Sequence, residues 1–255
     1  MDEKFFLTII IPCHNEEHRI GETLEAVAKH LKTKDYDAEV IVVDSGSSDK
    51  TIQVINSKNN LFKHLHLIEG HNIRGKGEAV RIGMLTGRGE YMCFIDADNG
   101  APFEQIDKLL KEKDKYDIVI GSRYVKGDET GKRNIIRTII SRGGNLLFLI
   151  LLDLNYKDTR CPLKLFSCEA ALKIFSVQKL DGFGFDTEIL VLARKLKYKV
   201  LEIPVWWHEV GESKVNALSD SIKSILEIFQ IQWYLISGAY KNAKKKDEKD
   251  LEKVL

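Results

Sequence analysis

Two carboxylates, Asp96 and Asp98, stand directly after an apolar run at 91–95 that is typical of a buried strand. Residues two apart on a strand face the same side, so both side chains can converge on one cation. Carboxylate oxygens suit Mg²⁺ or Mn²⁺, and either ion can bridge the diphosphate of a substrate. The spacing therefore predicts a Mg²⁺ or Mn²⁺ site formed by Asp96 and Asp98.

Polar clusters also follow two other predicted strands. Residues 12–16 close the strand at 5–12, and residues 44–49 follow the strand at 39–43. In a parallel sheet these strand ends meet at one edge, where open α/β sheets bind ligands. Asp44 can accept hydrogen bonds from a nucleobase or a ribose there. The alternative is that Asp44 and Asp49 only cap the next helix.

A basic, glycine-containing turn at 74–77 precedes another predicted helix. Its cations and flexible backbone suit a diphosphate, although such a turn is not specific by itself. The turn lacks the spacing of a Walker phosphate loop, and no GxGxxG follows the first strand. Both absences disfavour kinase-like and dinucleotide-binding classes.

The elements that must position these residues alternate along the chain. Predicted strands lie at 5–12, 39–43, 65–68, 91–95, 117–120 and 200–206, and predicted helices at 20–31, 51–56, 77–85 and 103–113. A loop leading into a helix is expected at 181–197. This alternation predicts an α/β fold with a mostly parallel sheet and helices on both faces.

The composition is that of a folded globular protein, with 44% hydrophobic and 30% charged residues among 255. The net charge of +1 gives no reason to expect a nucleic-acid partner. The four cysteines lack CxxC spacing, which favours reduced thiols in a cytoplasmic setting. We recognise no signal peptide and no run long enough to span a membrane.

Two amphipathic stretches, at about 133–153 and 218–240, repeat apolar residues at helical spacing and have basic residues beside them. Such helices can lie on a membrane surface without crossing it. We expect them to hold the protein on the cytoplasmic face of a membrane as a peripheral protein. Ordinary core packing, or an oligomer formed through 218–240, remains the alternative.

Seven segments complete the pattern: IPCHNE (11–16), VDSGSSD (43–49), GKG (75–77), DAD (96–98), GSRY (121–124), DTRC (158–161) and WHE with GESK (207–214). In this order they resemble the family 2 glycosyltransferases of GT-A (Rossmann-like) fold, over about 5–215. The closest resemblance is to the polyprenyl-phosphate glycosyltransferase branch, which includes the dolichyl-phosphate glucose and mannose synthases. The resemblance implies a glycosyltransferase domain over 1–215 and a C-terminal amphipathic helix with a charged tail over 216–255.

The resemblance also implies roles for individual residues. The nucleotide sugar would be bound by Pro12, Asn15, Glu16, Asp44, Lys76, Asp96, Asp186, Trp207 and Lys214. The divalent cation would be held by Asp96 and Asp98, and the acceptor phosphate by Arg123, Arg137 and Ser141. Catalytic roles would fall to Asp98, Arg123 and Glu188.

The implied reaction is an inverting, metal-dependent transfer of a hexose from a nucleotide sugar to a polyprenyl (dolichyl) phosphate, with UDP-glucose as the expected donor. GDP-mannose is the alternative donor. A sugar-hydroxyl acceptor would need a carboxylate base, for which Asp186 and Glu188 are candidates, although both could be ordinary first-turn helix acids. A nucleotide-sugar-binding scaffold without turnover is the non-enzyme alternative. A sugar-phosphate nucleotidyltransferase is disfavoured because 11–20 lacks a glycine-rich basic signature.

Overall fold

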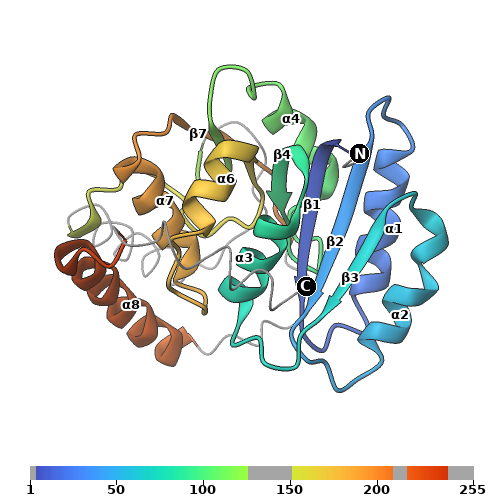
Figure 1. Cartoon of the computed structure of the whole chain (residues 1–255), viewed down its shortest axis with the longest axis horizontal. Coiled ribbons are helices and arrows are strands. Elements are labelled where there is room, and N and C mark those ends of the chain that lie inside the picture. Colours follow the sequence, from blue (N-terminus) through green and yellow to red (C-terminus); the bar gives the residue numbers. More distant parts are fainter. Residues whose placement is uncertain (1–3, 126–150, 209–216, 241–255) are drawn as a thin grey trace.

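The computed structural model describes residues 4–125, 151–208 and 217–240, with side chains from residue 226 onward in the last of these segments. In this part of the chain seven strands form one sheet in the order β3-β2-β1-β4-β6-β5-β7 (Figure 1). The strands are β1 (Phe5–Cys13), β2 (Ala38–Asp44), β3 (Leu65–Glu69), β4 (Gly89–Phe94), β5 (Ile118–Ser122), β6 (Lys164–Ser167) and β7 (Val200–Pro204). Both pairs that include β6 are antiparallel, and the other pairs are parallel. The predicted mostly parallel α/β sheet is confirmed.

Helices cover both faces of this sheet (Figure 1). They are α1 (Ile20–Leu31), α2 (Thr51–Ser57), α3 (Lys76–Thr86), α4 (Ile106–Leu110), α6 (Cys168–Phe175), α7 (Phe185–Lys195) and α8 (Ala217–Ser237), with 3₁₀ turns η1 (Asn59–Leu61) and η2 (Phe103–Gln105). Helices α1, α2 and α4 pack on one face, and α3, α6, α7 and α8 on the other. The two faces give the protein two apolar layers.

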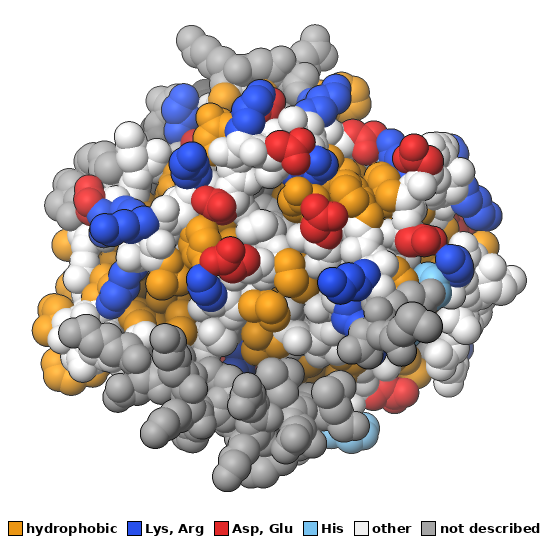
Figure 2. Space-filling view, turned by 45° about the horizontal axis from the view of Figure 1, so that its top comes forward, with side chains coloured by type: hydrophobic (Ala, Val, Ile, Leu, Met, Phe, Trp, Pro, Cys, Tyr) orange, Lys and Arg blue, Asp and Glu red, His pale blue; other side chains and the backbone are white. Residues whose placement is uncertain are grey.

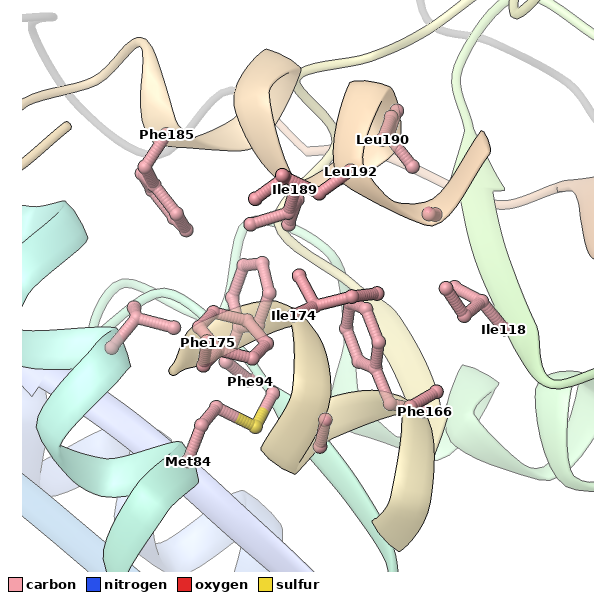
Figure 3. Close-up of a cluster of buried hydrophobic side chains, with 14 of the residues drawn as sticks. Met84, Phe94, Ile118, Phe166, Ile174, Phe175, Phe185, Ile189, Leu190 and Leu192 are labelled. Carbon is pink, nitrogen blue, oxygen red and sulfur yellow. The ribbon is translucent and has the colours of Figure 1, made fainter. Parts of the chain in front are cut away.

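Strand β1 shows how the sequence builds both layers at once. Ile9 and Ile11 are buried against the α1 side, whereas Ile10 between them is buried against the α3 side. Successive side chains of a strand point to opposite faces, so a strand covered on both sides is apolar throughout. On the α3 side, Phe94 and Phe166 lie among the residues of α6 and α7 (Figure 3).

Three elements differ from the sequence-based prediction. Strand β6 and helix α6 were not predicted, because Lys164 opens the short run 164–167 with a charge and hides its strand character. The helix predicted at 103–113 is instead a 3₁₀ turn followed by the short helix α4, which ends at Leu110.

Helix α8 has two apolar faces. Ile228 and Ile231 are buried beside α7 in the core. A second set points outward, and we call it the α8 stripe: Leu226 (62% exposed), Phe229 (58%), Trp233 (66%) and Ile236 (78%). The helix is fixed to α7 near both ends of its described side chains, because Gly184 N donates to Glu227 (3.0 Å) and Tyr240 Oη donates to Glu188 (2.8 Å).

The described surface carries a mixture of charged and apolar side chains. On the face shown in Figure 2, basic and acidic side chains are interspersed with apolar ones. Within the residues that the structure describes, no helix is both long enough and apolar enough to span a bilayer.

Candidate functional site

The loops after β1 and β2 are tied to each other at the carboxyl edge of the sheet. Asn15 N donates to Ser47 Oγ (2.8 Å), and Asn15 Oδ1 accepts from Ser48 N (2.9 Å). Asn15 has a φ of +54°, a left-handed conformation that asparagine tolerates and that often marks functional loops. Pro12, next to last in β1, and Glu16 flank this joint. The polar clusters at these strand ends therefore meet, as predicted.

Asp44 organises the loop that follows β2. Its buried carboxylate accepts hydrogen bonds from Gly46 N (3.0 Å), Ser47 N (2.9 Å) and Ser47 Oγ. The thiol of Cys13 lies 3.6 Å from Asp44 Oδ1, the oxygen that also accepts from Ser47 Oγ, because Cys13 and Asp44 are register partners. Asp44 thus shapes one wall of the site through its contacts with the loop.

Asp96 and Asp98 follow β4 and are each about one quarter exposed. Both face cations: Lys76 Nζ pairs with Asp96, and Arg19 Nη1 lies 3.8 Å from Asp98 Oδ2. Arg19 also forms two 2.5 Å bonds to Glu16, which links the β1 loop to the carboxylate pair.

The carboxylate pair fits a divalent cation. The pKa of Asp98 is raised, first by burial and then by the charge of Asp96, so the two side chains repel each other and positive charge nearby relieves this cost. Among the described residues no group of three or more His, Cys, Asp or Glu side chains could hold a metal. Two carboxylates suit Mg²⁺ or Mn²⁺ that completes its shell with substrate phosphates and water.

Lys76 opens α3, and its backbone is seated on the loop before α7. Gly77 N donates to Asp181 O (2.7 Å), and a Cβ at Gly77 would come within 2.6 Å of Leu180 O. Only glycine permits this close approach of two backbones. Burial lowers the pKa of Lys76, but the charges of Asp96 and Asp186 outweigh it, and the pKa is raised. Lys76 therefore remains a cation beside the carboxylates of Asp96 and Asp98.

Arg123 follows β5 and is connected through Trp207 to residues 96–100, which we call the metal loop after its expected ligands Asp96 and Asp98. Its guanidinium makes a bidentate pair with Asp158, at 2.7 and 2.9 Å, and stacks 4.9 Å from the ring centre of Trp207. Trp207 in turn packs against Gly100, whose added Cβ would lie 3.0 Å from the ring. Trp207 thus joins the predicted acceptor arginine to the loop that carries Asp98.

Asp186, the second residue of α7, forms a fully buried ion pair with Lys164 of β6. Lys164 Nζ also donates to Cys161 O (2.6 Å) and lies 5.3 Å from the ring centre of Phe94. The pair joins α7 to β6. The charge of Asp186 also helps to raise the pKa of Lys76.

Glu188, for which we expect a catalytic role, lies in α7 and takes part in three hydrogen bonds. Its fully buried carboxylate accepts from Lys179 N (2.8 Å), Leu180 N (2.8 Å) and Tyr240 Oη (2.8 Å). Residues two apart on a helix point in different directions, so Asp186 and Glu188 cannot share one site. Glu188 therefore holds the loop before α7, on which the start of α3 with Lys76 rests.

We expect Glu188→Gln to lower the free energy of unfolding by about 1–3 kcal/mol, because the amide nitrogen would face a donor inside the core. Burial raises the pKa of Glu188 above its ordinary 4.5. With a raised folded-state pKa, the stabilisation by Glu188 is full below pH 4.5 and falls as the pH rises through the folded-state value. Urea denaturation should therefore show that the difference in free energy of unfolding between wild type and variant decreases as the pH rises. Glu169→Gln, at an exposed carboxylate, serves as the control. A difference in free energy of unfolding between wild type and Glu188→Gln that is the same at every pH would contradict the structural role of Glu188.

Three predicted residues, Arg137, Ser141 and Lys214, lie outside the described residues, as do most of the 133–153 insertion and the charged tail from 241. Two site residues had no predicted role. Arg19 could have been found from its spacing of three from Glu16 at a helix start, which is typical of an ion pair. Asp158 was recognised only as part of a motif.

The fold is shared with two solved synthases, one of them in complex with UDP. One is glucosyl-3-phosphoglycerate synthase from Mycobacterium tuberculosis, in complex with Mn²⁺, UDP and glucosyl-3-phosphoglycerate (TM-score 0.66, 19% identity, covering 89% of this chain and 80% of that one). Another is mannosyl-3-phosphoglycerate synthase from Rubrobacter xylanophilus (TM-score 0.70, 16% identity, 91% and 75% coverage). These similarities show that the chain has the GT-A fold.

Sequence comparison gives the family. The model for Glycosyl transferase family 2 matches residues 8–175. The dolichyl-phosphate beta-glucosyltransferase of Saccharomyces cerevisiae is 36% identical, over 96% of this chain and 79% of its own length. The human enzyme of the same name is 29% identical, over 92% and 77%. The chain belongs to glycosyl transferase family 2.

Proposed function

We propose that this glycosyltransferase transfers glucose from UDP-glucose to a polyprenyl phosphate such as dolichyl phosphate, with inversion at the anomeric carbon and with Mg²⁺ or Mn²⁺. The observation that carries the proposal is the pairing of two charged subsites at one edge of the sheet. Asp96, Asp98 and Lys76 suit a metal-bound diphosphate, and Arg123 suits an anionic acceptor. The names of the relatives, dolichyl-phosphate beta-glucosyltransferases, support the acceptor and the glucosyl group.

On the donor side, the loops containing Pro12, Asn15, Glu16 and Asp44 would form the wall against the nucleoside. Lys76 would turn from Asp96 toward the diphosphate as the donor binds. Asp96 and Asp98 would hold the cation, which supplies Lewis-acid stabilisation of the negative charge on the departing diphosphate. The lysine adds a fixed positive charge where that negative charge develops.

On the acceptor side, the structure favours a phosphate over a sugar hydroxyl. A hydroxyl needs a carboxylate base, but Asp186 is paired with Lys164, and Glu188 is buried among its own donors. A phosphate is already an anion at neutral pH and needs only to be oriented. Arg123 meets this need, and Trp207 keeps it beside the metal loop.

The test is transfer of radiolabelled glucose from UDP-glucose into dolichyl phosphate, with Mg²⁺ or Mn²⁺ and detergent, followed by organic extraction. GDP-mannose is run in parallel. The proposal expects an extractable, acid-labile product from UDP-glucose that a chelator abolishes. Product from GDP-mannose alone would overturn the choice of sugar and nucleotide, and no lipid product from either donor would overturn the acceptor.

We further propose that the α8 stripe rests on the membrane that holds the acceptor lipid. Four large apolar side chains spaced by three or four residues form a narrow apolar face on one side of the helix. The sequence after the helix, with Lys241, Lys244, Lys245 and Lys246, would meet anionic lipid headgroups. This arrangement is that of an interfacial rather than a spanning helix.

The double variant Phe229→Gln/Trp233→Gln should bind vesicles of mixed neutral and anionic phospholipid at least about tenfold more weakly, since burial of each large apolar side chain contributes about 1.5–3 kcal/mol. Vesicle flotation measures the effect. Leu172→Gln, at an exposed leucine of α6, is the control. Unchanged flotation combined with loss of a dimer in sedimentation would show that the stripe meets a second subunit instead.

A further inference from the structure

We propose that Asp158 is a positioning residue that fixes the guanidinium of Arg123 for the acceptor phosphate. The inference rests on the proposed transfer to a polyprenyl phosphate, and it deepens the acceptor side of that site. Asp158 lies in the segment between β5 and β6, 35 residues from Arg123 along the chain. It supplies the one carboxylate that meets Arg123 among the described residues.

The contact between the two residues has a fixed geometry. Asp158 accepts from the backbone N of Arg123 (2.9 Å) as well as from Nε (2.7 Å) and Nη2 (2.9 Å). A bidentate pair defines the plane of the guanidinium, and the backbone contact holds the carboxylate at the base of the same residue. Asp158 is only 2% exposed, so water does not compete for these bonds.

Asp158 is itself held by the strand beside β5. Glu202 of β7 accepts hydrogen bonds from Lys157 N (3.0 Å) and Asp158 N (2.7 Å). Strands β5 and β7 are parallel neighbours, and Ile120 pairs with Glu202 in their register. Strand β5 thus leads to Arg123, and its neighbour β7 carries the residue that holds Asp158.

Trp207 limits the remaining freedom of the guanidinium, because Arg123 Cζ lies over the indole ring, 4.9 Å from the ring centre. The ring is held near the metal loop, because His208 N donates to Gly100 O (2.8 Å) and Gly100 N donates to Asp98 Oδ1 (2.9 Å). The guanidinium is thus constrained in its plane by Asp158 and on its face by Trp207. Its position relative to Asp98 follows from these contacts.

The contact with Asp158 leaves N–H donors of Arg123 for a phosphate and reduces the positive charge that the phosphate meets. A guanidinium has five N–H donors, and the carboxylate engages one on Nε and one on Nη2. The other donors, including both on Nη1, suit a phosphate oxygen. The negative charge of Asp158 offsets part of the positive charge, so the acceptor oxygen is oriented and keeps its nucleophilicity.

The experiment compares steady-state kinetics of wild type, Asp158→Asn and Arg123→Lys in the full-length protein with dolichyl phosphate and UDP-glucose. Both variants should raise the KM for dolichyl phosphate at least tenfold and lower kcat, because neither retains a bidentate ion pair. The KM for UDP-glucose, and its slow hydrolysis without acceptor, should stay within twofold of wild type. Asp153→Asn, which breaks an exposed pair with Arg194, is the matched control and should change nothing.

An unchanged acceptor KM, or equal losses for donor and acceptor, would overturn the positioning role. If Asp158→Asn does not fold, Glu202→Gln decides the question, since it weakens the hold on Asp158 and leaves Arg123 unchanged. Failure of the proposed function has a different signature. In that case the wild type itself would make no lipid-linked product, while the donor hydrolysis could still be compared.

Discussion

Asp98→Asn is expected to reduce glucosyl transfer by about a thousandfold, since a bound divalent cation contributes several kcal/mol of charge stabilisation to the transition state. The substitution removes one of only two described carboxylates at the metal loop, and Gly100 N can still donate to the remaining amide oxygen. The loop should therefore keep its shape and lose its affinity for the ion. Titration calorimetry of UDP in the presence of Mn²⁺ should show a matching loss of metal-dependent binding.

The control for this variant is Asp107→Asn, at a carboxylate that pairs with Lys34 and His30 on the α4 side of the sheet. It should retain wild-type transfer. Wild-type activity in Asp98→Asn, or Mn²⁺-dependent UDP binding equal to that of the wild type, would show that the metal is held elsewhere.

Lys164→Met should lower the free energy of unfolding by about 3–5 kcal/mol, because it leaves the carboxylate of Asp186 buried without its partner. Asp186→Asn should be similarly costly for the opposite reason, since the ammonium of Lys164 is fully buried. The double variant Lys164→Met/Asp186→Leu should recover most of the loss, as apolar replacements of buried ion pairs often do. Urea denaturation of the three variants measures these values.

The folded double variant also separates two roles of Asp186. If the carboxylate serves only to join α7 to β6, transfer should survive in the double variant. If it also supports Lys76, the KM for UDP-glucose should rise while the protein stays folded. Single variants that differ from wild type by less than about 1 kcal/mol would show that the pair is not buried in solution.

Much of this site could be predicted because its signals are local. The strand ends at Pro12, Asp44 and Asp96 each combine an apolar run with a polar turn, and a parallel sheet must bring such ends to one edge. Strand β6 escaped prediction because the charge of Lys164 is neutralised by Asp186, which lies 22 residues away.

The roles of acidic residues were harder to predict. Sequence spacing placed Asp186 and Glu188 together as candidate bases, yet their partners come from β6 and from Tyr240, which no local pattern reveals. Asp158 had no predicted role for the same reason, because its partner lies on a strand end far along the chain. Partners of buried charges depend on the tertiary fold and not on spacing.

The anchoring of α8 has a consequence for shortened forms of the protein. A chain cut at residue 216 would lose Glu227 and Tyr240 together, leaving Gly184 N without its acceptor and Glu188 without one of its three donors. Loss of Ile228 and Ile231 would open an apolar hollow beside α7, next to the loop on which Gly77 rests. The last helix is thus not an interchangeable module. In any engineered chimera, the α8 stripe and the loop before α7, on which the backbone at Lys76 and Gly77 rests, would therefore have to come from the same protein.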